Sequence, residues 1–164
     1  MRSCAPDAPI ILGDARLTLA REPDGFYDLI ILDAYSSDAI PIHLATREAM
    51  ALYKRKLAPN GAVLMHISNR HFELSGVVAG ICAANDLKTW VGADIPRPPR
   101  KEGESEDADP PYVYTSQIAI CAAQPGDIGS LANSLYWEFI KPHPKERVWS
   151  DDYSNIIGAL LKRL

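Results

Sequence analysis

Two carboxylates follow closely on an apolar stretch of this 164-residue chain. Residues 27–32 form the stretch, Asp33 comes directly after it, and Asp38 lies in the polar loop beyond. One carboxylate of such a pair can bind a cationic amine while the other accepts its proton, which is general-base chemistry. Alternatively, both side chains cap a turn and the helix that follows. The spacing alone leaves the two interpretations open.

The stretch before Asp33 predicts the element that positions both carboxylates. It lacks regular polar alternation, is long enough for a strand and is too short for a solitary helix. Apolar side chains on both faces are typical of a central parallel strand that is covered on both sides. Ligands of open α/β sheets bind beyond the carboxyl ends of such strands, so Asp33 and Asp38 are expected where the sheet would bind its ligand.

The remaining chain alternates between short apolar runs and helical periodicity. Strands are expected at 9–12, 62–67, 87–91 and 113–122, and helices at 15–21, 46–58, 74–84, 127–139 and 156–164, with Pro59, Asn60 and Gly61 forming a turn. This order predicts an α/β fold with a mainly parallel sheet. The last strand is expected to be antiparallel, because the segment before it has no helical pattern.

The length predicts one domain over residues 1–164. Apolar residues make up 47% and charged residues 23%, as is ordinary for a globular protein. Residues 95–112 differ, because prolines and charges crowd there. This composition predicts a flexible, solvated loop.

The net charge and the cysteines indicate which classes of partner and which cellular compartment to expect. The net charge of −4 does not indicate a basic surface for binding nucleic acid. No apolar run approaches the roughly 20 residues of a membrane helix. The three cysteines suggest neither a metal-ligand pair nor a disulfide framework, and Cys82 and Cys121 are expected to pack in the core. No metal site is expected, and the reducing cytoplasm is the expected location.

Several motifs resemble the spermidine synthase-like, or polyamine aminopropyltransferase-like, branch of the Rossmann-type S-adenosylmethionine-dependent methyltransferases. The similarity covers most of residues 9–92 and the tail. It is carried by Leu12-Gly13-Asp14-Ala15-Arg16, Tyr27-Asp28-Leu29-Ile30-Ile31-Leu32-Asp33, Ser36-Ser37-Asp38, Leu57-Ala58-Pro59-Asn60-Gly61 and Trp149-Ser150-Asp151-Asp152-Tyr153-Ser154-Asn155.

The resemblance implies a nucleotide co-substrate, either S-adenosylmethionine or its decarboxylated form. Asp14 would contact the adenine amino group, with Ala15 beside it. Tyr35 could stack on a ligand or merely cover the crevice. A sulfonium donor is already electrophilic, so the protein needs no covalent nucleophile and no metal.

The resemblance also assigns the acceptor side of the reaction. Asp33 would be the base that acts on an amine, and Asp38 would hold the amine or the amino end of the donor, with Ser36 and Ser37 in the substrate loop. Ala34 and Tyr35 make this loop longer than in aminopropyltransferases. Either aspartate could therefore occupy the basic position.

Two family elements do not occur in this sequence: the glycine-rich turn after the first strand and the acidic residue that holds the ribose. The expected sheet therefore lacks the first two strands, which in the family lie between the segments 9–12 and 27–32. An apolar strand edge left bare in this way invites pairing. We expect the edge to be covered by residues 9–12 or by a second copy of the chain.

Other polar residues have ordinary structural interpretations. His66 lies in an apolar run and is expected to be a satisfied core histidine. Asn69 and His71 could line the crevice or cap the next helix. Asp151 and Asp152 precede an apolar helix, where acidic residues are favoured by the dipole; the resemblance offers the alternative that they return to the site.

Three functions remain. The first is aminopropyl transfer to a small-molecule amine by a spermidine synthase-like enzyme. The second is methyl transfer by an S-adenosylmethionine-dependent enzyme of the same fold. The third is a catalytically inactive fragment that serves as a binding or assembly module, favoured by the missing nucleotide-binding elements.

Overall fold

The computed structural model describes residues 7–34, 41–69, 72–93 and 116–161. The loop expected at 95–112 lies outside these residues. No helix within the described ranges has the length and apolar character to span a membrane. In chain order, the elements are α1 (Ala15–Ala20), β1 (Tyr27–Leu32), the 3-10 helix η1 (Ile42–Leu44), α2 (Arg47–Lys56), β2 (Leu57–His66), α3 (Ser75–Ala83), β3 (Lys88–Ala93), β4 (Gln117–Ala122), the 3-10 helix η3 (Pro125–Asn133), β5 (Trp137–Ile140) and α4 (Ile156–Leu161).

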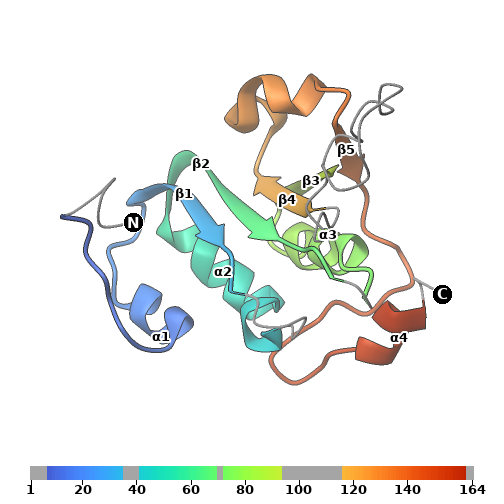
Figure 1. The fold of residues 1–164 in the computed structure, drawn as a ribbon, viewed down its shortest axis with the longest axis horizontal. Helices are drawn as coiled ribbons and strands as arrows, with labels where there is room; N and C mark the ends of the chain where they lie inside the picture. The colour runs from blue at the N-terminus through green and yellow to red at the C-terminus, as the bar shows by residue number, and fades with distance from the viewer. Residues whose placement is uncertain (1–6, 35–40, 70–71, 94–115, 162–164) are drawn as a thin grey trace, which may run out of the picture.

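The five strands form one sheet in the order β1-β2-β4-β3-β5 (Figure 1). β1 and β2 pair in parallel, whereas β4 pairs antiparallel with both β2 and β3, and β5 pairs antiparallel with β3. β1, β2 and β3 therefore run in one direction, and β4 and β5 run against them. The α/β class and the antiparallel β4 agree with the sequence-based expectation.

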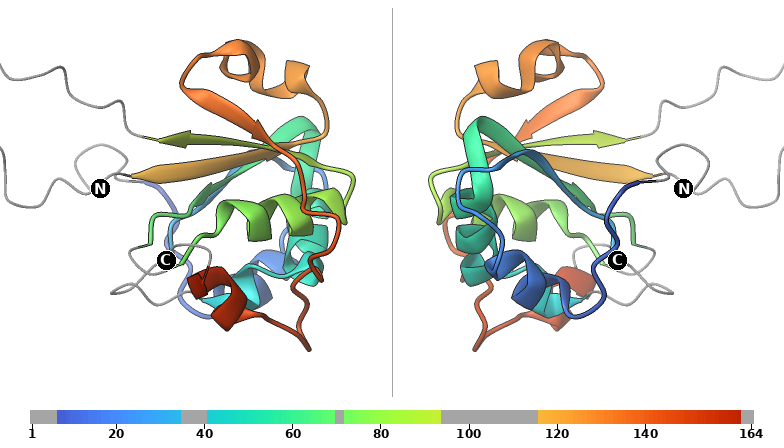
Figure 2. Two further views of the ribbon diagram at one scale, coloured as in Figure 1. Left: turned by 90° about the vertical axis from the view of Figure 1, so that its right-hand side faces the viewer. Right: turned by 90° about the vertical axis from the view of Figure 1, so that its left-hand side faces the viewer.

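Helices cover the two faces of the sheet unequally. Figure 2 shows α2, α3 and α4 on one face and η3 on the other. The larger core lies under α2 and α3, where Met50, Tyr53, Val63 and Ile81 are fully buried. A smaller cluster under η3 joins Trp90, Ile120 and Ile128, among others. β4 contributes to both clusters and is therefore covered on both faces.

β1 is one of the two edge strands of the sheet, so the prediction of a central strand covered on both faces is wrong. Ile30 is buried in the main core, but Leu29 and Ile31 on the opposite face are 46% and 60% exposed. The physical reason is that η3 packs on this face over β2, β4 and β5, and the buried cluster beneath it includes no residue of β1. Residues 8–12 also lack regular structure, so the strand expected there is absent, and within the described chain the pairing partner of β1 is β2.

The link between α2 and β2 is tighter than the sequence suggests. Thr46 caps α2 as expected, since its Oγ1 accepts a hydrogen bond from the Ala49 N–H at 3.1 Å. The helix ends at Lys56, and the expected turn at Pro59, Asn60 and Gly61 lies instead inside β2. There the pairing with β1 shifts register, and Asn60 adopts a φ of 65°. The three residues form an irregularity in a strand and do not separate two elements.

The helix expected at 127–139 is also wrong. η3 ends at Asn133, and residues Trp137–Ile140 form β5 along the edge of β3. Gly129 has a φ of 58°, which breaks the helix, and Phe139 contacts Trp90 with ring centroids 5.5 Å apart. Tertiary pairing with β3 therefore overrides the local helical tendency.

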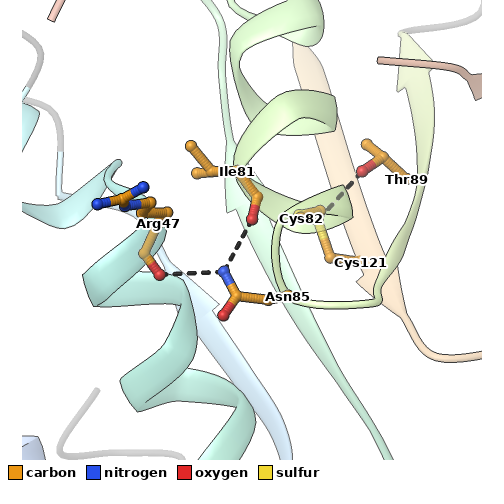
Figure 3. The surroundings of a disulfide bond; sticks show 6 residues. All are labelled: Arg47, Ile81, Cys82, Asn85, Thr89 and Cys121. Carbon is orange, nitrogen blue, oxygen red and sulfur yellow. Dashed lines mark hydrogen bonds between the residues drawn. A yellow bond between two sulfur atoms is a disulfide. The ribbon is translucent and has the colours of Figure 1, made fainter. Parts of the chain in front are cut away.

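Cys82 and Cys121 form a disulfide, contrary to the expectation of unpaired core cysteines (Figure 3). α3 carries Cys82 across the sheet above Cys121 in β4, with the two Cα atoms 6.5 Å apart and both residues fully buried. Beside the disulfide, the Asn85 amide donates hydrogen bonds to the carbonyls of Ile81 and Arg47, which ties α3 to α2. The cysteine argument for a reducing compartment therefore no longer holds.

Candidate functional site

Asp33 and His66 meet at the carboxyl ends of the two parallel strands. Leu32 of β1 pairs with Met65 of β2, so the residues that follow them are brought side by side. Asp33 Oδ1 lies 2.8 Å from His66 Nδ1. The Asp33 side chain is 70% exposed and the His66 side chain 33%. His66 is thus satisfied by hydrogen bonds as expected, but it lies at the surface and not in the core.

Ser68 extends this contact into a chain of hydrogen bonds. His66 Nε2 lies 2.7 Å from Ser68 Oγ, and Ser68 Oγ accepts a hydrogen bond from the Gln117 N–H at 2.6 Å. The Ile67 N–H donates to the Gln117 carbonyl at 2.9 Å, which fixes the end of β2 against the start of β4. The imidazole is therefore held between the exposed Asp33 carboxylate and a hydroxyl anchored to the sheet.

A second polar cluster joins the start of α1 to the tail. Arg16 donates two hydrogen bonds of 2.7 Å to the two carboxylate oxygens of Asp151. The Thr46 hydroxyl donates to Asp151 Oδ1 at 2.8 Å, and the Asp151 N–H donates to Glu48 at 3.0 Å. The hydrogen bond with Arg16 is the main cause that lowers the pKa of Asp151. A cleft of about 410 Å³ opens here, lined by Arg16, Ile42, His43, Thr46 and residues 150–154.

Asp14 and Ala15, the expected nucleotide residues, lie beside β1. Asp14 Oδ1 accepts a hydrogen bond from the Leu17 N–H at 2.9 Å, so Asp14 caps α1, and its other oxygen is 3.7 Å from His43 Nε2. Ala15 lines a groove of about 290 Å³ whose other wall includes Ile31 of β1. The capping interpretation of Asp14 is therefore realised, and contact with adenine stays a prediction.

The other predicted site residues, Tyr35, Ser36, Ser37 and Asp38, lie outside the described residues. The structure therefore does not test the pairing of Asp33 with Asp38. Within the described ranges, no cluster of three or more histidine, cysteine, aspartate or glutamate side chains could hold a metal ion.

Sequence reasoning missed His66 and Asp151 for different reasons. The apolar run continues to Ile67, whereas β2 ends at His66, so the sequence did not mark His66 as the residue at the carboxyl end of the strand. Asp151 was expected to serve as a charge near a helix start, but α4 begins at Ile156, and Asp151 pairs instead with Arg16, 135 residues away in sequence. Asn69 accepts a hydrogen bond from the Phe72 N–H at 3.0 Å within the loop before α3, so it does not cap that helix, whose N-cap residue is Leu74.

Comparisons with known proteins give distant structural similarity only. No family model matches the chain, and no curated protein does. Among solved structures, the chain is similar to the crystal structure of MNMC2 from Aquifex aeolicus, with 18% sequence identity and a TM-score of 0.43. The match covers 77% of this chain and 36% of that chain. A similarity this distant carries no argument about activity or substrate.

Proposed function

We propose that this chain is a spermidine synthase-like transferase that uses an S-adenosyl nucleotide and transfers an aminopropyl group to a small-molecule amine. The observation that supports it best is the exposed Asp33 carboxylate at the carboxyl end of a parallel strand pair. Ligands of α/β sheets bind at that edge, and a carboxylate there suits a cationic acceptor. The donor carbon is activated by its sulfonium, so the protein supplies binding, orientation and a base.

The position of the Gly13-Asp14-Ala15 motif is compatible with this proposal. It lies along the groove beside β1, and Ile11 and Ile31 provide apolar lining there. A mostly apolar groove with a few polar groups is typical of sites for small organic ligands. Methyl transfer from S-adenosylmethionine is the second candidate, because it would use the same groove but would not need the Asp33 carboxylate.

Calorimetry with S-adenosylmethionine, decarboxylated S-adenosylmethionine and methylthioadenosine tests the nucleotide. Saturable binding of any of the three supports a transferase. If none of them binds, the remaining function is that of a catalytically inactive binding or assembly module. Asp14→Ala should abolish binding if Asp14 contacts adenine. Asp14→Ser is the matched control for the cap, because serine caps helices as well as aspartate does but lacks the carboxylate. If Asp14→Ser binds as well as the unmodified chain, Asp14 does not contact the nucleotide.

We further propose that a second copy of the chain covers the free edge of β1. Residues 9–12, the other expected cover, do not form a strand. Antiparallel pairing of two β1 strands centred on Ile30 would bring the exposed Leu29 and Ile31 of both copies together. The same register would place each Asp28 opposite an apolar residue and keep the two carboxylates apart. β1 is therefore self-complementary, as a two-fold interface requires.

A further inference from the structure

We propose that His66 is a positioning residue that holds the Asp33 carboxylate for a cationic amine, with Ser68 holding the imidazole in turn. This inference rests on the proposed function and names a residue that neither the motifs nor the comparisons assign. It reverses the expectation that His66 is a core histidine. Three contacts carry it, and each is a hydrogen bond between described residues.

The first contact fixes the tautomer of His66. An ionised carboxylate only accepts hydrogen bonds, so the proton between Asp33 Oδ1 and His66 Nδ1, which are 2.8 Å apart, belongs to the imidazole. His66 Nε2 then accepts the hydroxyl proton of Ser68 at 2.7 Å. The chain of hydrogen bonds therefore runs from the Ser68 hydroxyl through the ring to the carboxylate.

Ser68 suits this task because its position is set by the backbone. Its oxygen accepts the Gln117 N–H at 2.6 Å, and its hydroxyl has a second acceptor, the Gln117 carbonyl at 3.4 Å. When His66 is neutral, the hydroxyl donates to Nε2. When His66 is protonated, the hydroxyl can turn to the Gln117 carbonyl and accept from Nε2. The imidazole is thus held in either protonation state.

Of the Asp33 and His66 side chains, Asp33 provides the polar atom that is available to an amine. Both ring nitrogens of His66 are engaged, whereas among the described residues Asp33 Oδ2 has no hydrogen-bond partner. The side chain is 70% exposed, so without His66 it would be free to change rotamer. Holding Oδ1 leaves Oδ2 to accept an N–H of the amine from a fixed position. This is the arrangement by which a neighbouring group orients a reactive one.

Replacing His66 with asparagine or glutamine tests its two contacts one at a time. The amide nitrogen of His66→Asn lies near the position of Nδ1 and can still donate to Asp33. The amide nitrogen of His66→Gln lies near the position of Nε2 and can reach only Ser68. We expect His66→Asn to bind putrescine within about threefold of the unmodified chain, and His66→Gln to lose about 10- to 100-fold in affinity or in kcat/KM.

A spectroscopic measurement tests the contact without any turnover. With ¹⁵N-labelled histidine, NMR should show His66 as the Nδ1–H tautomer, and Asp33→Ala should shift the population toward Nε2–H. A histidine that does not donate to Asp33 would not respond in this way. Thermal unfolding of each variant shows whether the chain remains folded, and Ser68→Ala, which keeps the contact with Asp33, should retain the Nδ1–H tautomer.

The outcomes separate this inference from the proposed function. An Nε2–H tautomer in the unmodified chain, equal effects of His66→Asn and His66→Gln, or no binding of putrescine would overturn the inference. The Nδ1–H signature together with a selective loss in His66→Gln supports it. If both are found but no S-adenosyl nucleotide binds, the role of His66 stands and the proposed transferase fails.

Discussion

Loss of the Cys82–Cys121 disulfide should lower the free energy of unfolding by about 4 kcal/mol. The cysteines are 39 residues apart in sequence. A cross-link of that span removes on the order of 13 cal/mol/K of entropy from the unfolded chain, which is about 4 kcal/mol at 25 °C. For a chain of this size, that corresponds to a fall of roughly 8–16 °C in Tm. Both thiols would remain in the core, so the loss reflects the cross-link and not the packing.

Urea unfolding with and without reductant measures this loss. Because both cysteines are fully buried, the chain must be unfolded in reductant and refolded in its presence before the titration. The double variant Cys82→Ala/Cys121→Ala is the control, since its unfolding should not respond to reductant. If oxidised and reduced chains unfold at the same urea concentration, or if mass analysis finds free thiols at both positions, the disulfide assignment is refuted.

Three further predictions concern other contacts. Thr46→Ala should cost about 1–3 kcal/mol in urea unfolding, because it removes the cap of α2 and the hydrogen bond to Asp151, whereas Thr46→Ser should cost less. Asp151 has a lowered pKa when folded, so its stabilisation is present at neutral pH and lost in acid. The difference in stability from Asp151→Asn should therefore shrink as the pH falls below the ordinary carboxyl pKa of 3.8 toward the lower pKa of the folded state. Ile31→Lys should convert a dimer to a monomer by light scattering while circular dichroism shows a folded chain, because Ile31 is exposed in the single copy; a monomeric unmodified chain would contradict the β1 interface.

The elements that local chemistry determines were predictable. The apolar run before Asp33 gave β1, Thr46 gave the start of α2, and the small-residue run at 75–83 gave α3. The antiparallel β4 followed from the lack of a helical pattern before it. In each case, the deciding signal lies within a few residues of the element.

The features that depend on distant pairing were not predictable. β5 forms because β3 offers an edge to Trp137 and Phe139, although the local sequence has a helical tendency. The exposed face of β1 follows from the order of strands in the sheet, which periodicity does not encode. The disulfide likewise requires α3 to lie over β4.

In the candidate site too, local sequence identified single residues, whereas the contacts between them depend on distant pairing. Asp33 was identified from its place after an apolar run, but its partner His66 required the parallel register of β1 and β2. The contact of Arg16 with Asp151 joins two motifs of the resemblance that are 135 residues apart. Sequence reasoning located both motifs without locating the contact between them.

The most direct test of the central claim is aminopropyl transfer from decarboxylated S-adenosylmethionine to putrescine, compared between the unmodified chain and Asp33→Asn. We expect the unmodified chain to form spermidine and Asp33→Asn to lose about 10²- to 10⁴-fold in kcat, the range expected when a general base is removed. Equal rates for the two chains, or no transfer by the unmodified chain, would contradict this expectation.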